Sequence, residues 1–160
     1  MVISLNLSKC LCITEKGIEN LKYLTNLTEL NLSNCLQSES VLEILKYLTN
    51  LIKLNICNNS WITNINQLIL LRELNVSSCL RINYSSISAC TNLIKLFAYD
   101  TPGITNVNHF VLLQDLNAGG NCGINDFGII QCTNLYELNA RGNPNITNIN
   151  HLILLQNYSK

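Results

Sequence analysis

Apolar residues recur along the chain in a fixed order, apolar-x-x-apolar-x-apolar, in which x is usually polar. Seven segments fit this pattern; they begin at residues 2, 27, 51, 71, 93, 113 and 135, and an eighth begins at 155. Residues two apart, such as Leu30 and Leu32, lie on one face of a strand, so each segment predicts a short strand with one buried face. One copy cannot bury that face alone, whereas stacked copies share a continuous core. We therefore expect residues 1–160 to form a single solenoid domain with seven full repeats and a partial eighth.

The spacing of the repeats predicts how the chain returns from one strand to the next. From position 51 onward shorter, 20-residue repeats alternate with longer, 22-residue repeats, and the segment at 62–71 recurs in similar form at 104–113 and 146–155. Such repeats leave about a dozen residues for the return, which predicts turns or 3₁₀ segments rather than full helices. The first two repeats, which begin at positions 2 and 27, are longer still, and the segments 15–21 and 39–47 within them have helical periodicity.

A small polar or sulfur-containing residue stands three positions after the third apolar residue of every complete repeat. These residues, the cap column, are Cys10, Cys35, Asn59, Cys79, Thr101, Asn121 and Asn143. The pattern L-x-x-L-x-L-x-x-N/C resembles that of leucine-rich repeat proteins over essentially the whole chain. The resemblance implies an α/β fold: a leucine-rich repeat solenoid with a curved parallel β-sheet on the concave side and turns, 3₁₀ segments and one or two short helices on the convex side. We expect the cap side chains to bond strand-end backbone groups inside the coil.

The same resemblance implies a non-enzymatic module that binds another protein through the concave face. Two alternatives stay open. Residues 10–18 resemble the cysteine-containing repeats of F-box ubiquitin-ligase receptors, which would make the chain a substrate-recognition part of such a complex, although we expect no F-box segment before them. A structural or orphan repeat protein from an amoeba or a large DNA virus would account for the composition rich in Asn, Ile and Lys.

Charge and hydropathy exclude two classes of partner. Ten Lys and Arg residues balance ten Asp and Glu residues, so the chain lacks the basic field through which proteins bind nucleic acid. No apolar run approaches the roughly 20 residues of a membrane span, and residues 1–6 lack the charged start and apolar core of a signal peptide. We therefore expect neither a nucleic acid nor a membrane as partner.

The eight cysteines favour neither disulfides nor zinc. None belongs to a C-x-x-C pair, and Cys90 and Cys132, which lie two repeats apart, share one core column. Buried, reduced cysteines favour a cytoplasmic protein. Glycosylation at the acceptor sequences of Asn6, Asn31 and Asn75 would obstruct the concave face, which favours the same location.

Catalytic residues, cofactors and metals are not expected. Gln67, His109 and His151 occupy one column in every second repeat, which we interpret as a polar surface position, and no nucleophile and base recur around them. The Gly-rich run at 118–123 lacks the Lys-Ser/Thr of a phosphate loop and predicts a turn.

The residues between and beside the core leucines point to the concave face and form three columns. The asparagine column is Asn6, Asn31, Asn55, Asn75, Asn117 and Asn139, and its amides are expected to bond along the ladder. The charge column is Ser4, Glu29, Lys53, Glu73, Lys95, Asp115 and Glu137. Its charges alternate in sign from Glu29 to Asp115, which predicts ion pairs between neighbours. The third column is Ser8, Ser33, Cys57, Ser77, Tyr99, Gly119 and Arg141. Two aromatic residues interrupt the pattern: Phe97 in the asparagine column and Tyr99 in the third column. Gly119 is expected to leave room beside Tyr99 for an inserted side chain.

Exposed aromatic residues with Arg nearby are typical of protein interfaces. The candidate partner-binding residues are Phe97, Tyr99, Lys95, Asp115, Arg141 and Glu73.

The first predicted strand, residues 2–8, offers an apolar and largely uncharged sheet edge. Solenoids need polar caps, because a bare edge can pair with another chain. We therefore expect either a longer solenoid or self-association through this uncapped N-terminal edge.

Overall fold

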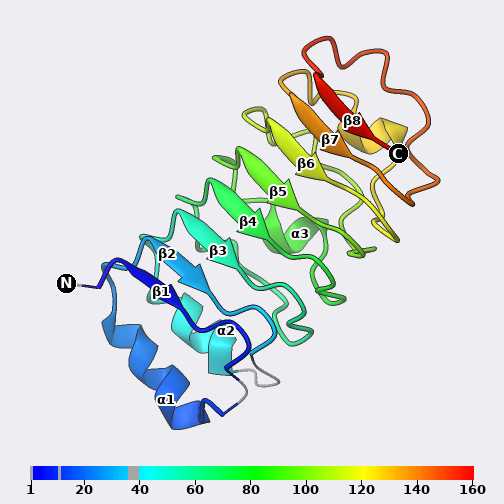
Figure 1. Cartoon of the computed structure of the whole chain (residues 1–160). Helices are drawn as coiled ribbons and strands as arrows, with labels where there is room; N and C mark the ends of the chain where they lie inside the picture. Colours follow the sequence, from blue (N-terminus) through cyan, green and yellow to red (C-terminus); the bar gives the residue numbers. More distant parts are fainter. Residues whose placement is uncertain (1, 11, 36–39) are drawn as a thin grey trace.

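The computed structural model describes residues 2–10, 12–35 and 40–160. Its main element is one parallel sheet of eight strands in the order of the sequence (Figure 1). The strands are β1 (Ser4–Asn6), β2 (Glu29–Asn31), β3 (Lys53–Asn55), β4 (Glu73–Asn75), β5 (Lys95–Phe97), β6 (Asp115–Asn117), β7 (Glu137–Asn139) and β8 (Asn157–Ser159). Equivalent residues lie opposite each other, as Leu30, Leu54 and Leu74 do in β2, β3 and β4. The predicted α/β solenoid is confirmed.

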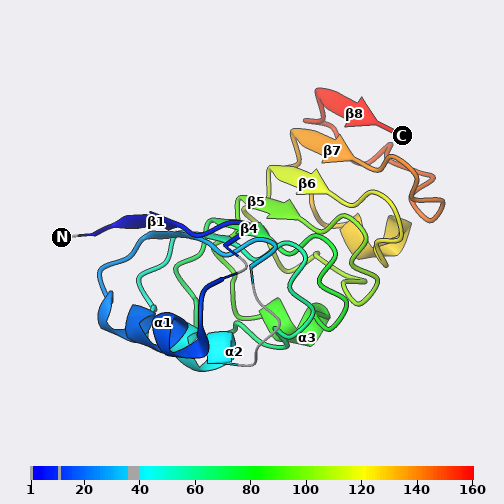
Figure 2. The same ribbon diagram turned by 60° about the horizontal axis from the view of Figure 1, so that its bottom comes forward.

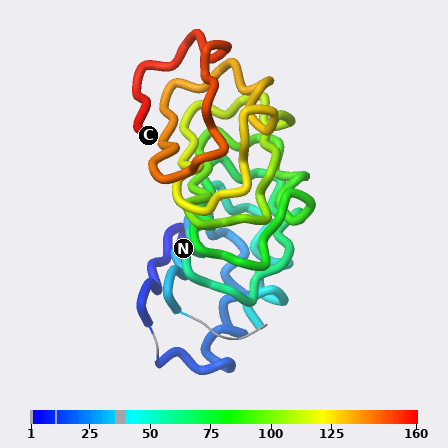
Figure 3. Tube along the Cα trace, turned by 90° about the vertical axis from the view of Figure 1, so that its right-hand side faces the viewer, coloured from blue at the N-terminus to red at the C-terminus, as the bar shows by residue number. Residues whose placement is uncertain are grey.

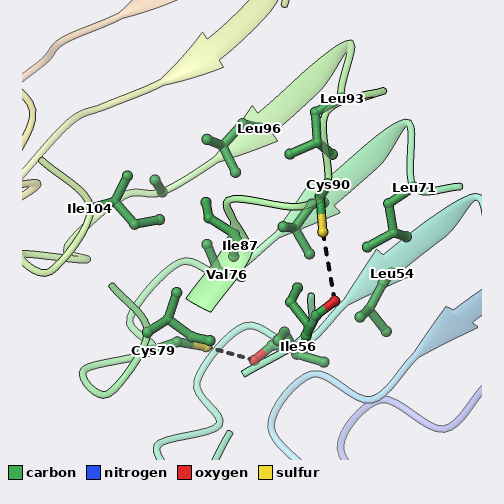
Figure 4. Packing of buried hydrophobic residues seen from close by; sticks show 14 of the residues in the cluster. Leu54, Ile56, Leu71, Val76, Cys79, Ile87, Cys90, Leu93, Leu96 and Ile104 are labelled. Atoms are coloured by element: carbon green, nitrogen blue, oxygen red, sulfur yellow. Dashed lines mark hydrogen bonds between the residues drawn. The ribbon is translucent and has the colours of Figure 1, made fainter. Parts of the chain in front are cut away.

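The core lies between the sheet and the return segments. The middle residue of each interior strand is a leucine that points inward, and Leu74, Leu96 and Leu116 are fully buried. Burial of one such side chain contributes about 1.5–3 kcal/mol. Return-path residues such as Ile87 and Ile104 fill the space beneath the strands (Figure 4). The coils stack one on the next, so this core runs along the whole solenoid (Figure 3).

The first two repeats place helices on the side away from the sheet (Figure 2), as their length predicts. In the first repeat α1 (Glu15–Glu19) continues into the 3₁₀ segment η1 (Asn20–Tyr23). The helix begins after Thr14, whose Oγ1 accepts a hydrogen bond from the Gly17 amide at 3.2 Å. The second repeat contains α2 (Ser40–Leu45); residue 39 of the predicted helix lies outside the described residues.

A third helix differs from the expectation of turns and 3₁₀ segments alone in the later repeats. It is α3 (Tyr84–Ile87), and it begins with a reciprocal cap in which Asn83 and Ser86 bond each other's backbone amides. The other 22-residue repeat contains the 3₁₀ segment η2 (Asp126–Ile129). The additional length of these repeats thus allows one helical turn, and the 20-residue repeats, which the structure describes in full, return through turns.

Five of the seven residues of the cap column bond carbonyl groups inside the coil, as expected: Cys35, Asn59, Cys79, Thr101 and Asn143. Asn59 Nδ2 donates to the Leu32 carbonyl at 2.8 Å, and Thr101 Oγ1 donates to that of Val76 at 2.9 Å. Cysteine serves in the same way: Cys79 Sγ lies 3.0 Å from the Ile56 carbonyl oxygen (Figure 4). The cap side chains thus donate hydrogen bonds to carbonyl groups that the short strands leave without a backbone partner.

The prediction for Asn121 is wrong, because its side chain is exposed and the buried residue is Cys122. Gly120 adopts the left-handed conformation that Asp100 has in the preceding repeat, with φ of 61° and 52°. Asn121 bonds outward: its backbone N–H donates to Asp100 Oδ1 at 2.7 Å, and its side-chain Nδ2 donates to the same oxygen at 3.2 Å. The buried position of the cap column therefore moves one residue along the chain, to Cys122, whose Sγ lies 3.9 Å from the Ile104 carbonyl oxygen.

All eight cysteines are free. In the described chain, no helix combines the length and the apolar character that crossing a membrane requires. The outer edge of β1 has no strand partner among the described residues, and Val2 and Ile3 beside it are about half exposed. Self-association through this edge stays a prediction.

Candidate functional site

The charge column runs across the concave face and is largely paired with itself. Lys53 Nζ lies between two carboxylates, 3.5 Å from Glu29 Oε1 and 3.8 Å from Glu73 Oε2. Lys95 Nζ lies 3.4 Å from Asp115 Oδ2. Glu73 therefore pairs with Lys53 and, within the described residues, has no ion pair with Lys95. Exposed pairs of this kind contribute about 0–1 kcal/mol each, so they organise the face more than they stabilise the fold.

Asp115 is the least exposed acid of these pairs, with 17% of its side chain accessible. Burial raises the pKa of its carboxyl group, and the hydrogen bond and charge of Lys95 oppose that shift. Glu137 follows on the next strand with the same sign, and its Oε1 accepts a hydrogen bond from Asn157 Nδ2 at 3.0 Å. The alternation of charge ends at this point, as the sequence indicates.

The asparagine column is bonded along each strand rather than across the ladder. Asn55 Oδ1 accepts from the Cys57 amide at 3.0 Å, and Asn75 Oδ1 accepts from the Ser77 amide at 3.0 Å. The same bond occurs at Asn6, Asn31, Asn117 and Asn139. Among the described residues no hydrogen bond joins one amide of the column to the next, so that expectation is wrong. A side chain that bonds the backbone two residues on makes a local interaction, and it fixes the turn after these six strands.

Phe97 and Tyr99 interrupt the columns on β5 and in the turn after it. Phe97 is half-buried, in register between Asn75 and Asn117, and Tyr99 is 41% exposed. The Tyr99 ring covers Gly119: a Cβ added there would lie 2.9 Å from Tyr99 Cδ2. The expectation that Gly119 leaves room for a partner's side chain is therefore wrong, because Tyr99 itself occupies that space.

Arg141 lies on the other side of Gly119 from Tyr99. A Cβ at Gly119 would be 2.8 Å from the Arg141 carbonyl oxygen, so the three turns stack closely. The Arg141 side chain is exposed. Of the six candidate residues, Lys95, Phe97 and Tyr99 share one strand and its turn, Glu73 and Asp115 flank it, and Arg141 follows two repeats later.

Two open hollows lie on the concave face. The first, of about 310 Å³, is lined by Ser4, Leu5, Asn6, Glu29, Leu30, Asn31, Lys53, Leu54, Asn55, Glu73, Asn75 and Phe97. The second, of about 320 Å³, is lined by Asp115, Glu137, Leu138, Asn139, Gln156, Asn157, Tyr158 and Ser159. Sequence reasoning named Glu73, Phe97 and Asp115 but missed Glu29 and Lys53, although both belong to the same charge column.

In the column of Gln67, His109 and His151, which are all half-buried, His109 departs from the polar surface position expected from the sequence. Both ring nitrogens of His109 are buried, and neither has a hydrogen-bond partner in the part of the chain that the structure describes. Its ring packs edge-on against Tyr84, with centroids 4.9 Å apart, and against Phe110 at 3.8 Å. Burial lowers the pKa of His109. By contrast His151 Nε2 lies 3.1 Å from the Ile129 carbonyl oxygen.

The described residues contain no group of three or more His, Cys, Asp or Glu side chains arranged to hold a metal ion. The burial of Cys79, Cys90, Cys122 and Cys132 raises the pKa of their thiols to about 11 or 12. Such thiols stay protonated near neutral pH and are poor nucleophiles.

No protein-family model and no curated protein matches the chain. Solved structures do. An internalin, InlF from Listeria monocytogenes, matches 98% of the chain with a TM-score of 0.74 and 24% identity, and the chain spans 47% of that structure. The TLR13 complex with ssRNA13 matches 86% with a TM-score of 0.60 and 20% identity, and the chain spans 22% of it.

The Toll–Spatzle complex of Drosophila matches 79% of the chain with a TM-score of 0.54 and 15% identity, and the chain spans 18% of it. These similarities show that the chain folds as a leucine-rich repeat solenoid. The chain spans less than half the length of each of the three structures.

Proposed function

We propose that this chain is a non-enzymatic module that binds a protein partner through the concave face of its solenoid. One observation carries the proposal: Phe97 and Tyr99 present two aromatic rings where the other repeats have Asn and mostly small residues. Aromatic residues at the centre of a surface, surrounded by polar groups, contribute most of the energy in many protein interfaces.

The surrounding charges support this assignment. Because Lys53 and Lys95 already pair with carboxylates of the same face, a partner that used only charge would have to break those pairs. An apolar side chain that packs on Phe97 has no such cost. In the proposal Lys95, Asp115, Glu73 and Arg141 form the polar rim of the contact.

A protein fits this face better than a nucleic acid does. Toll is structurally similar and is seen in complex with Spatzle, and TLR13, also similar, is seen in complex with ssRNA13. The charge column here carries four carboxylates, of Glu29, Glu73, Asp115 and Glu137, against two lysines, Lys53 and Lys95. An excess of negative charge repels a phosphate backbone. Fluorescence anisotropy with labelled single-stranded RNA at low salt is expected to show no binding; a salt-dependent rise would contradict the proposal.

The main test is capture of partners from a lysate of the source cells by the tagged whole chain. Phe97→Ala/Tyr99→Ala is expected to lose partners that the unchanged chain retains. The matched control is Phe127→Ala/Tyr23→Ala, which removes two strongly exposed rings from the return path and is expected to retain them. Thermal unfolding of all three proteins checks that the fold is intact. Retention of every partner by the concave-face variant contradicts the proposal.

We also propose a reducing, cytoplasmic location, supported by the free thiols and by the three acceptor asparagines of the concave column. Substrate recognition in a ubiquitin ligase stays a hypothesis based on residues 10–18, of which residue 11 lies outside the described residues.

A further inference from the structure

The ends at which the strands begin form one flank of the solenoid, because all strand arrows point the same way (Figure 1). We call it the strand-start flank. The two residues before the first core leucine lie on it, and they are of two kinds. Aliphatic pairs precede β4, β6 and β8: Ile69–Leu70, Val111–Leu112 and Ile153–Leu154. Thr-Asn pairs precede β2, β3, β5 and β7: Thr25–Asn26, Thr49–Asn50, Thr91–Asn92 and Thr133–Asn134.

The six residues of the aliphatic pairs are 45–82% exposed, although residues of these types are usually buried. They account for six of the large apolar side chains that the fold leaves in solvent, and they recur at every second strand. Regular exposure of this kind on one flank marks an interaction surface.

Hydrogen bonds place the two kinds of pair next to each other. Asn92 Nδ2 donates to the Ile69 carbonyl at 2.9 Å, and Asn134 Nδ2 donates to the Val111 carbonyl at 2.8 Å. These two Asn side chains therefore bend back onto the preceding aliphatic pair, and Asn50 makes the same bond to the Thr25 carbonyl at 2.9 Å. Since Thr and Asn are also smaller than Ile and Leu, the flank alternates between ridges and lower polar steps, with about 9.6 Å from ridge to ridge.

We propose that the strand-start flank binds a second copy of this chain, in a two-fold dimer whose ridges fit the lower steps of the partner. A two-fold axis perpendicular to the sheet, between β5 and β6, places the aliphatic pairs before β4, β6 and β8 opposite the Thr-Asn pairs before β7, β5 and β3 of the other copy. All three ridges of each copy then have a matching step, which is the self-complementarity that a two-fold interface requires.

The neighbouring row of side chains is compatible with this pairing. From β3 to β8 it consists of Ile52, Arg72, Ile94, Gln114, Tyr136 and Gln156, each directly after the first core leucine. The same axis sets Arg72 opposite Tyr136 of the other copy, Ile52 opposite Gln156 and Ile94 opposite Gln114. Arg72 is the one charge in this row, so no like charges meet, and an Arg beside a Tyr ring is favourable.

The dimer is tested by sedimentation equilibrium of the whole chain over a wide concentration range. The mass is expected to rise from 17.9 kDa toward twice that value. The variant Ile69→Thr/Leu70→Asn/Val111→Thr/Leu112→Asn lowers two ridges, and it is expected to weaken association at least about tenfold without lowering the melting temperature. A wild-type chain that stays monomeric throughout overturns the proposal.

A second variant distinguishes association through complementary shape from nonspecific hydrophobic association. Thr91→Ile/Thr133→Ile raises two of the lower steps and breaks none of the described side-chain hydrogen bonds. It adds apolar surface, yet it is expected to weaken the dimer, since the ridges of the partner no longer fit. Equal or stronger association overturns the proposal.

Two further measurements exclude other occupants of the surface. Ser4→Lys, which places a charge at the edge of β1, is expected to leave the dimer unchanged, and a monomeric Ser4→Lys chain would assign the interface to that edge instead. Flotation of a monomeric wild-type chain with phosphatidylcholine vesicles would assign the flank to lipid. Both results overturn the proposal.

Discussion

The first repeat and the interior repeats follow one sequence pattern but bury it to different degrees. Leu96 in β5 is fully buried, because β4 and β6 lie on either side and the return segments close the coil beneath it. Leu5, at the equivalent position of β1, is only half-buried and has β2 as its single strand partner. Burial of a residue in this fold thus depends on its neighbouring repeats as much as on its own side chain.

Thiol reactivity is expected to show the largest difference between the two regions. Cys12, in the first repeat, is exposed, whereas Cys90 and Cys132 are buried and burial raises the pKa of their thiols to about 12. We expect iodoacetamide to modify Cys12 roughly a thousandfold faster or more, since the buried thiols react only after unfolding. Mass spectrometry of timed samples measures the rates. Denaturant should equalise them, and a native disulfide would contradict the prediction.

Truncation of equivalent leucines tests the comparison directly. Leu96→Ala is expected to lower the free energy of unfolding by about 2–5 kcal/mol, because it leaves a cavity between two neighbouring repeats. Leu5→Ala removes the same atoms from a half-buried site and should cost clearly less. Chemical denaturation of both variants measures the difference. Equal losses would show that the first repeat is packed as tightly as the interior.

Removal of a cap is expected to have a smaller effect. Asn143 Nδ2 donates to the carbonyls of Ala118 at 2.8 Å and Ile124 at 3.0 Å, and the side chain is buried. Asn143→Ala should cost about 1–3 kcal/mol, because buried carbonyls lose their partner. Asn121→Ala, at the exposed position that the sequence pattern equates with it, is the control and should cost less than about 0.5 kcal/mol. A similar loss in both would contradict the displaced cap.

The smallest effect expected is a dependence of stability on pH through His109. Its pKa is lowered in the folded chain by burial, so the unfolded chain binds the proton more readily. Stability should therefore be complete above the unfolded pKa of about 6.5 and decline as the pH falls below it. His109→Gln, which copies Gln67 of the same column, should flatten the decline between about pH 7 and 5.5. Thermal unfolding across that range decides the matter, and an unchanged decline would exclude His109 as its source.

The strands, their register and most of the core follow from the leucine pattern, because burial along a repeated strand depends on spacing alone. Features that depend on side-chain contacts between repeats do not follow from the leucine pattern. The burial of His109 requires Tyr84 from the preceding repeat, and Tyr99 covers Gly119 of the following one. The helix α3 begins at a local cap between Asn83 and Ser86. These two residues are visible in the sequence, but they predict a helix less strongly than the short repeat length predicts a turn.

The alternation of shorter and longer repeats also has a consequence for how such a chain can change in length. Duplication or loss of one shorter and one longer repeat together keeps ridges and steps in phase; removal of the segment 71–112, for example, leaves an aliphatic pair before β6 and a Thr-Asn pair before β7. Loss of the segment 93–112 alone would set two Thr-Asn pairs side by side. From residue 51 onward the repeating unit is therefore two repeats, and length variants that keep this flank intact should differ by multiples of that unit.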